Sequence, residues 1–141
     1  MLNIIIPMAG AGSRFKVAGY DLPKPFIDVN GQMMIERVLD GINYPNAHYT
    51  LIIQEEFEKE NKVQLEKLAN KYHVAFVSVK KLTQGACCTA LAAHEIINNN
   101  IPVVFADSDN IFNNATFKAF VDDCLHRNID GGLLTFNTDK E

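Results

Sequence analysis

Two acidic residues, Asp107 and Asp109, stand two positions apart directly after the apolar run 102–106. Carboxylates with this spacing at the end of a strand can bind a hard cation both directly and through water. Mg²⁺ in proteins commonly takes one or two carboxylates and completes its shell with phosphate oxygens of a substrate. The pair therefore indicates a Mg²⁺ and phosphate site, although an Asp/Asn turn between a strand and a helix has the same composition.

A glycine-rich segment, residues 8–15 (MAGAGSRF), follows the apolar run 2–7. Gly10 and Gly12 let the backbone approach a phosphate closely, so that successive N–H groups can point at its oxygens. Arg14 adds a planar guanidinium suited to bidentate phosphate contact. A tight glycine turn that binds no ligand would look the same, so this loop alone is a weak signal.

Two better-known phosphate patterns do not fit this loop. A dinucleotide-binding fold would carry GxGxxG, but the third glycine position is Phe15, whose bulk hinders close packing of helix on strand. The pattern GxxxxGK[ST] is absent from the sequence. A dehydrogenase is therefore the weaker interpretation, and it would predict stabilisation by NAD without a need for Mg²⁺.

Lys24 lies between Pro23 and Pro25. The two prolines restrict the backbone and are expected to hold the Lys24 peptide extended. A lysine held in this way loses less conformational entropy on meeting an anion than one on a mobile loop. The alternative is a solvated lysine in a proline-rich turn.

A third segment of unusual composition covers residues 83–90 (TQGACCTA). Gly85 and the small residues after it would let a flat ring lie against the backbone, and the amino end of the following helix favours anions. Gln84 offers both a hydrogen-bond donor and an acceptor. Small residues that serve tight helix packing are the alternative interpretation.

The elements that must position these residues alternate along the chain between strand-like and helix-like patterns. The expected strands cover residues 2–7, 48–53, 74–79, 102–106 and 133–136, with a short extended piece at 26–29. The expected helices cover residues 33–42, 55–72, 86–98 and 117–125. Alternation of this kind implies right-handed crossovers. It predicts an α/β fold, a three-layer αβα Rossmann-like arrangement (GT-A type) with a mainly parallel sheet and helices on both faces.

In such sheets the ligand lies beyond the carboxyl ends of the strands. The loops expected there are 8–15, 54–55, 80–85 and 107–110, and three of these four carry unusual residues. This convergence predicts a nucleotide site. The candidate nucleotide-binding residues are Ala9, Gly10, Ala11, Gly12, Ser13, Gln54, Gln84, Gly85 and Asp107.

The glycine loop with its arginine, the PKP tripeptide ten residues later and the Asn30-Gly31 turn before a helix together resemble the sugar-nucleotide pyrophosphorylases. These are sugar-phosphate nucleotidylyltransferases, and the wording IPMAGAGSRF…AGY…PKPFIDVNG is similar to members that serve bacterial capsules and surface polysaccharides. One departure is that Ala9 to Gly12 alternate alanine and glycine, where the family often has two adjacent glycines. The resemblance spans the chain but only the N-terminal portion of a family member. We therefore expect residues 1–141 to be one nucleotide-binding domain, truncated at its C-terminus.

The resemblance implies transfer of a nucleoside monophosphate from a nucleoside triphosphate to a sugar 1-phosphate or similar phosphomonoester, with release of pyrophosphate, in the synthesis of surface-polysaccharide precursors. It implies catalytic roles for Arg14, Lys24 and Asp109, with Asp109 as the Mg²⁺ ligand. Gln84 and Gly85 match the segment that recognises the base. The wording at residues 109–112 is similar to thymidylyltransferases and favours a pyrimidine.

Two alternatives stay open. A GT-A-type glycosyltransferase would use Asp107 and Asp109 as a DxD motif, but the early glycine loop with arginine and the PKP tripeptide are not expected there. A non-catalytic nucleotide-binding module is the second, because the missing portion of the family normally carries the acceptor-phosphate pocket and a second metal-binding aspartate.

Composition narrows the partners of the chain. A net charge of −4 argues against a general nucleic-acid binder, and no apolar run approaches the length needed to span a bilayer. The first residues lack the basic start of a signal peptide, and three cysteines without CxxC spacing indicate neither a disulfide framework nor zinc. We expect a cytoplasmic protein whose partners are a nucleoside triphosphate and a phosphorylated acceptor. Homo-oligomerisation is left open.

Overall fold

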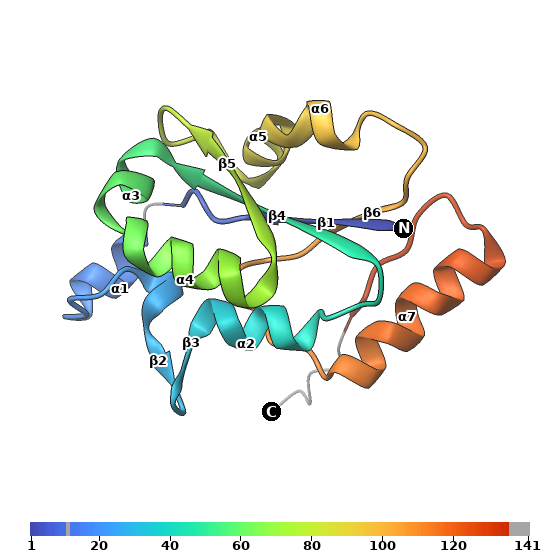
Figure 1. Ribbon diagram of the computed structural model, residues 1–141, viewed down its shortest axis with the longest axis horizontal. Helices are drawn as coiled ribbons and strands as arrows, with labels where there is room; N and C mark the ends of the chain where they lie inside the picture. Colours follow the sequence, from blue (N-terminus) through green and yellow to red (C-terminus); the bar gives the residue numbers. More distant parts are fainter. Residues whose placement is uncertain (11, 136–141) are drawn as a thin grey trace, which may run out of the picture.

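A four-stranded parallel sheet forms the centre of the protein in the computed structural model, which describes residues 1–10 and 12–135 (Figure 1). Its strands are β1 (Leu2–Pro7), β4 (Ala47–Gln54), β5 (Val74–Val79) and β6 (Val103–Phe105). They lie in the order β5-β4-β1-β6, and every neighbouring pair is parallel. Strand β1 is buried because it has a partner on each side and helices above and below. The predicted α/β class with a mainly parallel sheet is confirmed.

A small hairpin stands apart from this sheet and precedes the second helix. Strands β2 (Asp28–Val29) and β3 (Gln32–Met33) pair antiparallel around Asn30 and Gly31. Both turn residues have positive φ, 54° and 84°, which a two-residue hairpin turn of this kind requires and which Asn-Gly adopts readily. The predicted turn at this dipeptide is confirmed.

The helices and 3-10 turns connect the strands. They are α1 (Ser13–Val17), η1 (Lys24–Phe26), α2 (Met34–Gly41), α3 (Glu55–Glu60), α4 (Lys62–Tyr72), α5 (Ala86–Ala90), η2 (Leu91–Ala93), α6 (His94–Ile97) and α7 (Asn114–Arg127). Helices α2, α4 and α7 cover one face of the sheet, and α5 and α6 lie over the other (Figure 1). Among the described residues, none of these helices has the length and apolar character needed to cross a membrane.

The core divides into two parts because alternate residues of a strand point to opposite faces. Ile4 and Ile6 of β1 point into the larger part, where α2, α4 and α7 pack. Ile5, between them, points into the smaller part with Ile52 and with Ala93 of η2. The larger part gives the fold its three-layer form, because it lies between the sheet and three long helices.

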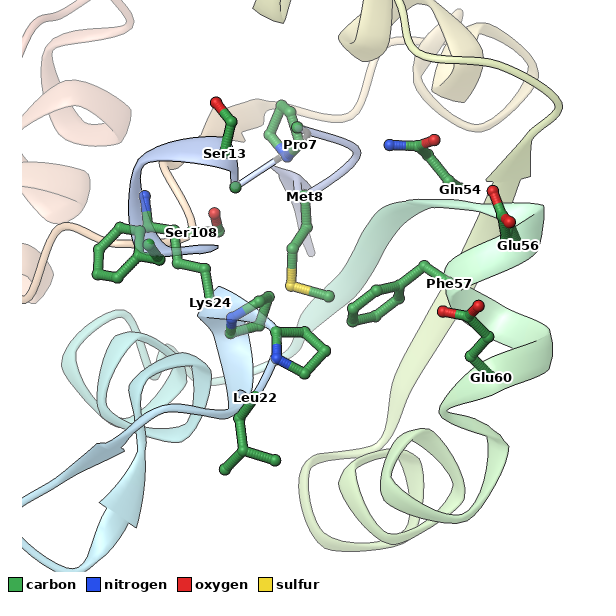
Figure 2. Close-up of a pocket in the computed structure, with 15 residues that line it drawn as sticks. Pro7, Met8, Ser13, Leu22, Lys24, Gln54, Glu56, Phe57, Glu60 and Ser108 are labelled. Carbon is green, nitrogen blue, oxygen red and sulfur yellow. The ribbon is translucent and has the colours of Figure 1, made fainter. Parts of the chain in front are cut away.

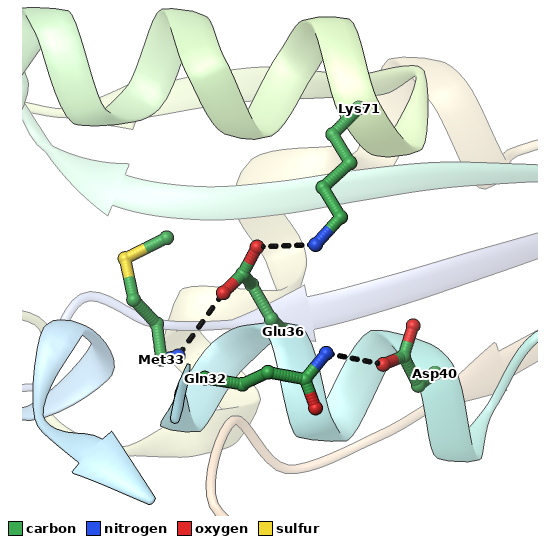
Figure 3. Close-up of polar contacts among 5 residues, drawn as sticks. All are labelled: Gln32, Met33, Glu36, Asp40 and Lys71. Atoms are coloured by element: carbon green, nitrogen blue, oxygen red, sulfur yellow. Dashed lines mark hydrogen bonds and ion pairs between the residues drawn. The ribbon is translucent and has the colours of Figure 1, made fainter. Parts of the chain in front are cut away.

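Helix α2 is tied to α4 by one carboxylate at its amino end (Figure 3). Glu36 accepts a hydrogen bond from the backbone N–H of Met33 at 3.0 Å and one from Lys71 Nζ at 2.8 Å. Nearby, the Gln32 amide donates to Asp40 at 3.1 Å. The hairpin, α2 and the end of α4 are therefore linked through polar groups as well as through the core.

Two predicted helices are interrupted. The helix expected over 55–72 is two helices, because Asn61 departs from helical dihedral angles, with φ of −121° and ψ of 24°. Its side-chain amide donates to the Phe57 carbonyl at 2.8 Å at this break. The helix expected over 86–98 is the short series α5, η2 and α6. There a 3-10 segment places Ala93 against Ile5 and Ile52, so packing on the sheet takes precedence over helical regularity.

The strand predicted over 133–136 is wrong for residues 133–135, and Phe136 lies outside the described residues. Leu134 packs against the larger core instead of joining the sheet. Just before it, Gly132 fits closely against α7, where an added Cβ would lie 2.8 Å from Cys124 Sγ. The apolar pattern here reflects contact with the core rather than strand pairing.

Candidate active site

A cleft of about 630 Å³ opens at the carboxyl end of β1, between the glycine loop, the PKP segment and helix α3 (Figure 2). It lies where a parallel sheet of this kind is expected to bind a ligand. The residues that line it are Pro7, Met8, Gly10, Gly12, Ser13, Phe15, Leu22, Pro23, Lys24, Pro25, Gln54, Glu56, Phe57, Glu60 and Ser108. Five of the predicted site residues are among them: Gly10, Gly12, Ser13, Lys24 and Gln54.

The start of the glycine loop is fixed by hydrogen bonds to its surroundings. The Met8 N–H donates to the Ile52 carbonyl at 2.8 Å, which extends the pairing of β1 with β4. The Gln54 side-chain amide donates to the Ala9 carbonyl, also at 2.8 Å. Gly12 has φ of 58°, so a side chain there would strain the backbone. The loop therefore leaves β1 at a fixed point beside β4.

Lys24 begins a single 3-10 turn rather than lying in an extended peptide, and that prediction is wrong. The Phe26 N–H donates to the Pro23 carbonyl at 2.8 Å and closes the turn over Lys24. Pro25 needs no N–H at this position, so the turn tolerates it. The backbone of Lys24 is still restricted, as expected. The restriction comes from the closed 3-10 turn and from Pro23 and Pro25 on either side of the lysine.

The ammonium of Lys24 contacts the carboxylate of Asp109, 85 residues further along the chain. On another side it faces the ring of Phe15, with 5.2 Å from Nζ to the ring centroid. The Phe15 ring in turn meets Tyr20 edge to face at 5.7 Å. The cation, the carboxylate and the aromatic ring thus form one group at the cleft.

The segment 106–110 brings Asp109 to this point. The Ala106 N–H donates to the Ile5 carbonyl at 3.0 Å, which fixes the end of β6 beside β1. Beyond it, Asp107 accepts a hydrogen bond from the Asn110 amide at 2.9 Å, while Asp109 faces Lys24. The two carboxylates therefore have different partners, and Ser108 between them lines the cleft.

Several predicted site residues do not line the cleft or are not among the residues that the structure describes. Gln84 and Gly85 are not among the residues that line the cleft; the Gly85 carbonyl instead accepts from the Thr89 hydroxyl at 3.2 Å in the first turn of α5. Ala11 lies outside the described residues. Arg14 is in α1, between two residues that line the cleft, but its side chain lies outside the description.

Sequence reasoning missed the apolar and acidic wall of the cleft. Met8 and Phe57 point into its middle, and Glu56 and Glu60 lie on α3 at the far side from Lys24 (Figure 2). Phe57 is held there by stacking on Phe26, with ring centroids 5.4 Å apart. Their position in the sequence could have indicated that they lie at the site, since α3 begins directly at the carboxyl end of β4.

The side chains near the cleft that could bind a metal ion are compatible with one kind of metal site. Within the residues that the structure describes, no group of three or more His, Cys, Asp and Glu side chains could enclose a metal ion. An ion held only by protein ligands therefore does not fit. A Mg²⁺ that takes Asp109 and draws its remaining ligands from phosphate oxygens and water does fit.

Known proteins resemble the chain in structure but not in sequence. No protein-family model matches the chain, and no curated protein matches it. Among solved structures, a nucleoside-diphosphate-sugar pyrophosphorylase from Vibrio cholerae RC9 matches 79% of the chain and 49% of its own length, with TM-score 0.64 and 22% identity. An inositol-1-phosphate CTP transferase from T. maritima matches 80% and 45%, with TM-score 0.65 and 20% identity.

A UDP-glucose pyrophosphorylase in complex with UDP-glucose matches 91% of the chain and 55% of its own length, with TM-score 0.65 and 14% identity. The chain thus spans about half the length of these structures. Likeness at such low identity shows a shared fold. It establishes the Rossmann-like arrangement of the GT-A type that the sequence predicts.

Proposed function

We propose that this chain is the nucleotide-binding part of a nucleotidyltransferase, which transfers a nucleoside monophosphate from a nucleoside triphosphate to a phosphorylated acceptor and releases pyrophosphate. The observation that carries the proposal is the contact of Lys24 with Asp109 beside a glycine-loop cleft. A cation and a metal-binding carboxylate, 85 residues apart in the chain, meet where the backbone is shaped for phosphate. The fold shared with pyrophosphorylases supports the same reaction class.

The reaction requires two anions to meet, because the acceptor phosphate must attack the α-phosphorus of the triphosphate. Two unit charges 4 Å apart interact by about 4 kcal/mol at an effective dielectric constant near 20. Lys24 would stabilise charge at the α-phosphate, the N–H groups of the glycine loop would hold the other phosphates, and Arg14 would neutralise the departing pyrophosphate. A Mg²⁺ bound at Asp109 would supply further neutralisation. The acceptor phosphate is already ionised, so no general base is needed.

The finer identity of the substrates is also part of the proposal. We propose a sugar 1-phosphate or a similar phosphomonoester as acceptor, in the supply of surface-polysaccharide precursors, and a pyrimidine triphosphate as donor. Two of the similar structures carry pyrimidine nucleotides in their names, CTP in one and UDP-glucose in the other. The three free cysteines fit a reducing compartment such as the cytoplasm.

Pyrophosphate release in the presence of Mg²⁺ tests the proposal, with the four common triphosphates and a panel of phosphorylated acceptors. We expect Lys24→Ala and Asp109→Ala each to lower turnover by about 100-fold, the effect of losing one preorganised charge. Lys67→Ala, which removes an exposed lysine on α4 that does not line the cleft, is the matched control and should keep the wild-type rate. Wild-type rates in both site variants would exclude these roles.

A non-catalytic nucleotide-binding module is the second candidate. The chain spans about half of each similar structure. The module predicts Mg²⁺-dependent thermal stabilisation by a triphosphate and no pyrophosphate release with any acceptor. Thermal shift and pyrophosphate release, both measured with the same triphosphates and acceptors, distinguish the module from the enzyme.

A further inference from the structure

Lys24 and Asp109 are each other's partner in the structure, although both are expected to bind other groups. The side chain of Lys24 is 22% exposed and that of Asp109 is 42% exposed, so the pair is partly withdrawn from water. The ammonium donates to a carboxylate oxygen, and the Phe15 ring lies against another side of it. The charges of the anion site and of the cation site therefore cancel locally.

Neither group can take its expected ligand without disturbing this contact. A divalent cation on the Asp109 carboxylate would lie next to the ammonium, and like charges at such a separation repel strongly in a partly buried site. A polyphosphate bound to Lys24 would lie next to the Asp109 carboxylate, and these negative charges would also repel each other. Either ligand alone must break the pair and leave one member unpaired.

We propose that Lys24 and Asp109 mask one another, so that a divalent cation and a polyphosphate bind to the cleft cooperatively. When both arrive, the carboxylate exchanges the ammonium for the cation, and the ammonium exchanges the carboxylate for a phosphate. No charge is then left without a partner, and the cation and phosphate also neutralise each other. This inference rests on the proposed function only in taking a nucleoside triphosphate as the natural polyphosphate.

The fold restricts the two groups to this exchange. Lys24 stands in the closed turn η1, and Asp109 follows β6, whose end is bonded to β1. Because both backbones are held, the exchange must occur by rotation of the side chains. The Phe15 ring attracts the ammonium and keeps it near the cleft when the pair opens.

The first test measures Mn²⁺ binding by isothermal titration, without any phosphate. Lys24→Met removes the masking cation and keeps the length of the side chain, so we expect Mn²⁺ affinity to rise about two- to fivefold, the range for a partly exposed ion pair. Lys67→Met removes the same charge from an exposed position on α4 that does not line the cleft and should leave the affinity unchanged. Equal Mn²⁺ affinity in wild type and Lys24→Met would overturn the proposal.

The second test measures binding of inorganic tripolyphosphate in the presence of EDTA. Asp109→Asn frees Lys24, so its affinity for tripolyphosphate should rise by a similar factor. In a parallel titration with Mn²⁺ and without EDTA, the gain in tripolyphosphate affinity that Mn²⁺ gives should be smaller in Asp109→Asn than in wild type. Asp107→Asn removes an equal charge two residues away but leaves the masking pair intact, and we expect a smaller gain. Weaker or unchanged tripolyphosphate binding by Asp109→Asn would contradict mutual masking.

These outcomes are separate from those of the proposed function. Both tests use Mn²⁺ and tripolyphosphate, and neither depends on turnover or on the nucleobase. A chain that releases no pyrophosphate can still show masking, and an active chain can lack it. Circular dichroism of each variant confirms that affinities are compared between folded proteins.

Discussion

Phe15 is the side chain on which the geometry of the cationic group depends. Its ring faces Lys24 at 5.2 Å and is itself fixed by edge-to-face contact with Tyr20. An aromatic ring in this position attracts an ammonium by about 0.5–1 kcal/mol at partly exposed sites. Phe15 thus acts on the ligand through Lys24, as a positioning residue.

We expect Phe15→Leu to weaken Mg²⁺-triphosphate binding about two- to fivefold, because the ammonium loses the ring that holds it. Phe15→Tyr should keep near wild-type affinity, since it preserves the aromatic face. Isothermal titration of both variants measures the difference. Equal affinity of the Leu and Tyr variants would show that the ring acts only by its volume.

Lys24 and Asp109 were predictable from sequence, whereas the apolar residues of the cleft and its acidic residues Glu56 and Glu60 were not. Lys24 and Asp109 were identified because a cation between prolines and a carboxylate after a strand are unusual in themselves. Phe57 looks like any core aromatic until its place beside the cleft is known. The Gly85 carbonyl accepts a hydrogen bond from the Thr89 hydroxyl at the start of α5, and the predicted contact of Gly85 with a base stays a prediction.

Among the elements, the carboxylate at the start of α2 makes the stability of the protein depend on pH. Burial alone would raise the pKa of Glu36, but the hydrogen bonds from Lys71 and from the Met33 N–H outweigh it and lower the pKa below its ordinary value. A group with a lowered folded-state pKa stabilises the protein above its unfolded-state pKa and loses this contribution as the pH falls through the folded-state value.

We expect Glu36→Gln to cost about 1 kcal/mol in the free energy of unfolding at pH 7, the scale of one intramolecular hydrogen bond. The gap between wild type and variant should narrow as the pH falls from 5 to 3, because the wild-type carboxyl then becomes protonated. Urea unfolding across this range measures it. Glu66→Gln removes an exposed partner of Lys62 at 3.9 Å and should show a much smaller effect.

The end of α2 packs so closely on the chain before α7 that it requires glycine. A Cβ added at Gly41 would lie 2.6 Å from the Phe112 carbonyl oxygen, which belongs to the backbone and cannot move aside easily. Gly41→Ala should therefore lower the free energy of unfolding by about 1–3 kcal/mol through overpacking. Gly131→Ala, with open space around its Cβ, is the control in the same urea titration.

Element types followed from the hydrophobic pattern, while their interruptions did not. The patterns of β1, β4 and β5 predict strands within one residue of their bounds, because buried parallel strands are continuous apolar runs. Asn61 interrupts a helix by departing from helical dihedral angles, and the residues 133–135 follow the core instead of the sheet. Such outcomes depend on neighbours that are distant in the sequence.

At the scale of the whole molecule, the order of the strands creates the site. Lys24 belongs to the connection that leaves β1, and Asp109 follows β6, the strand that pairs with β1 on the side away from β4. Alternation of strands and helices predicted a parallel sheet, but it does not specify which strands are neighbours. The sequence thus predicts that Lys24 and Asp109 serve one site, whereas their direct contact depends on β6 lying next to β1.

The proposed site is assembled from the first and last strands of the sheet, so a ligand bound there would hold the edge strand β6 to β1. Strand β6 is three residues long, with Val103 38% and Phe105 52% exposed, so it is expected to detach before the rest of the sheet. A triphosphate with Mg²⁺ should slow amide hydrogen exchange in β6 by the factor one plus the ligand concentration over its Kd, and leave β5 nearly unaffected. During synthesis, the same geometry means that a nascent chain cannot acquire its ligand before Asp109 has emerged from the ribosome.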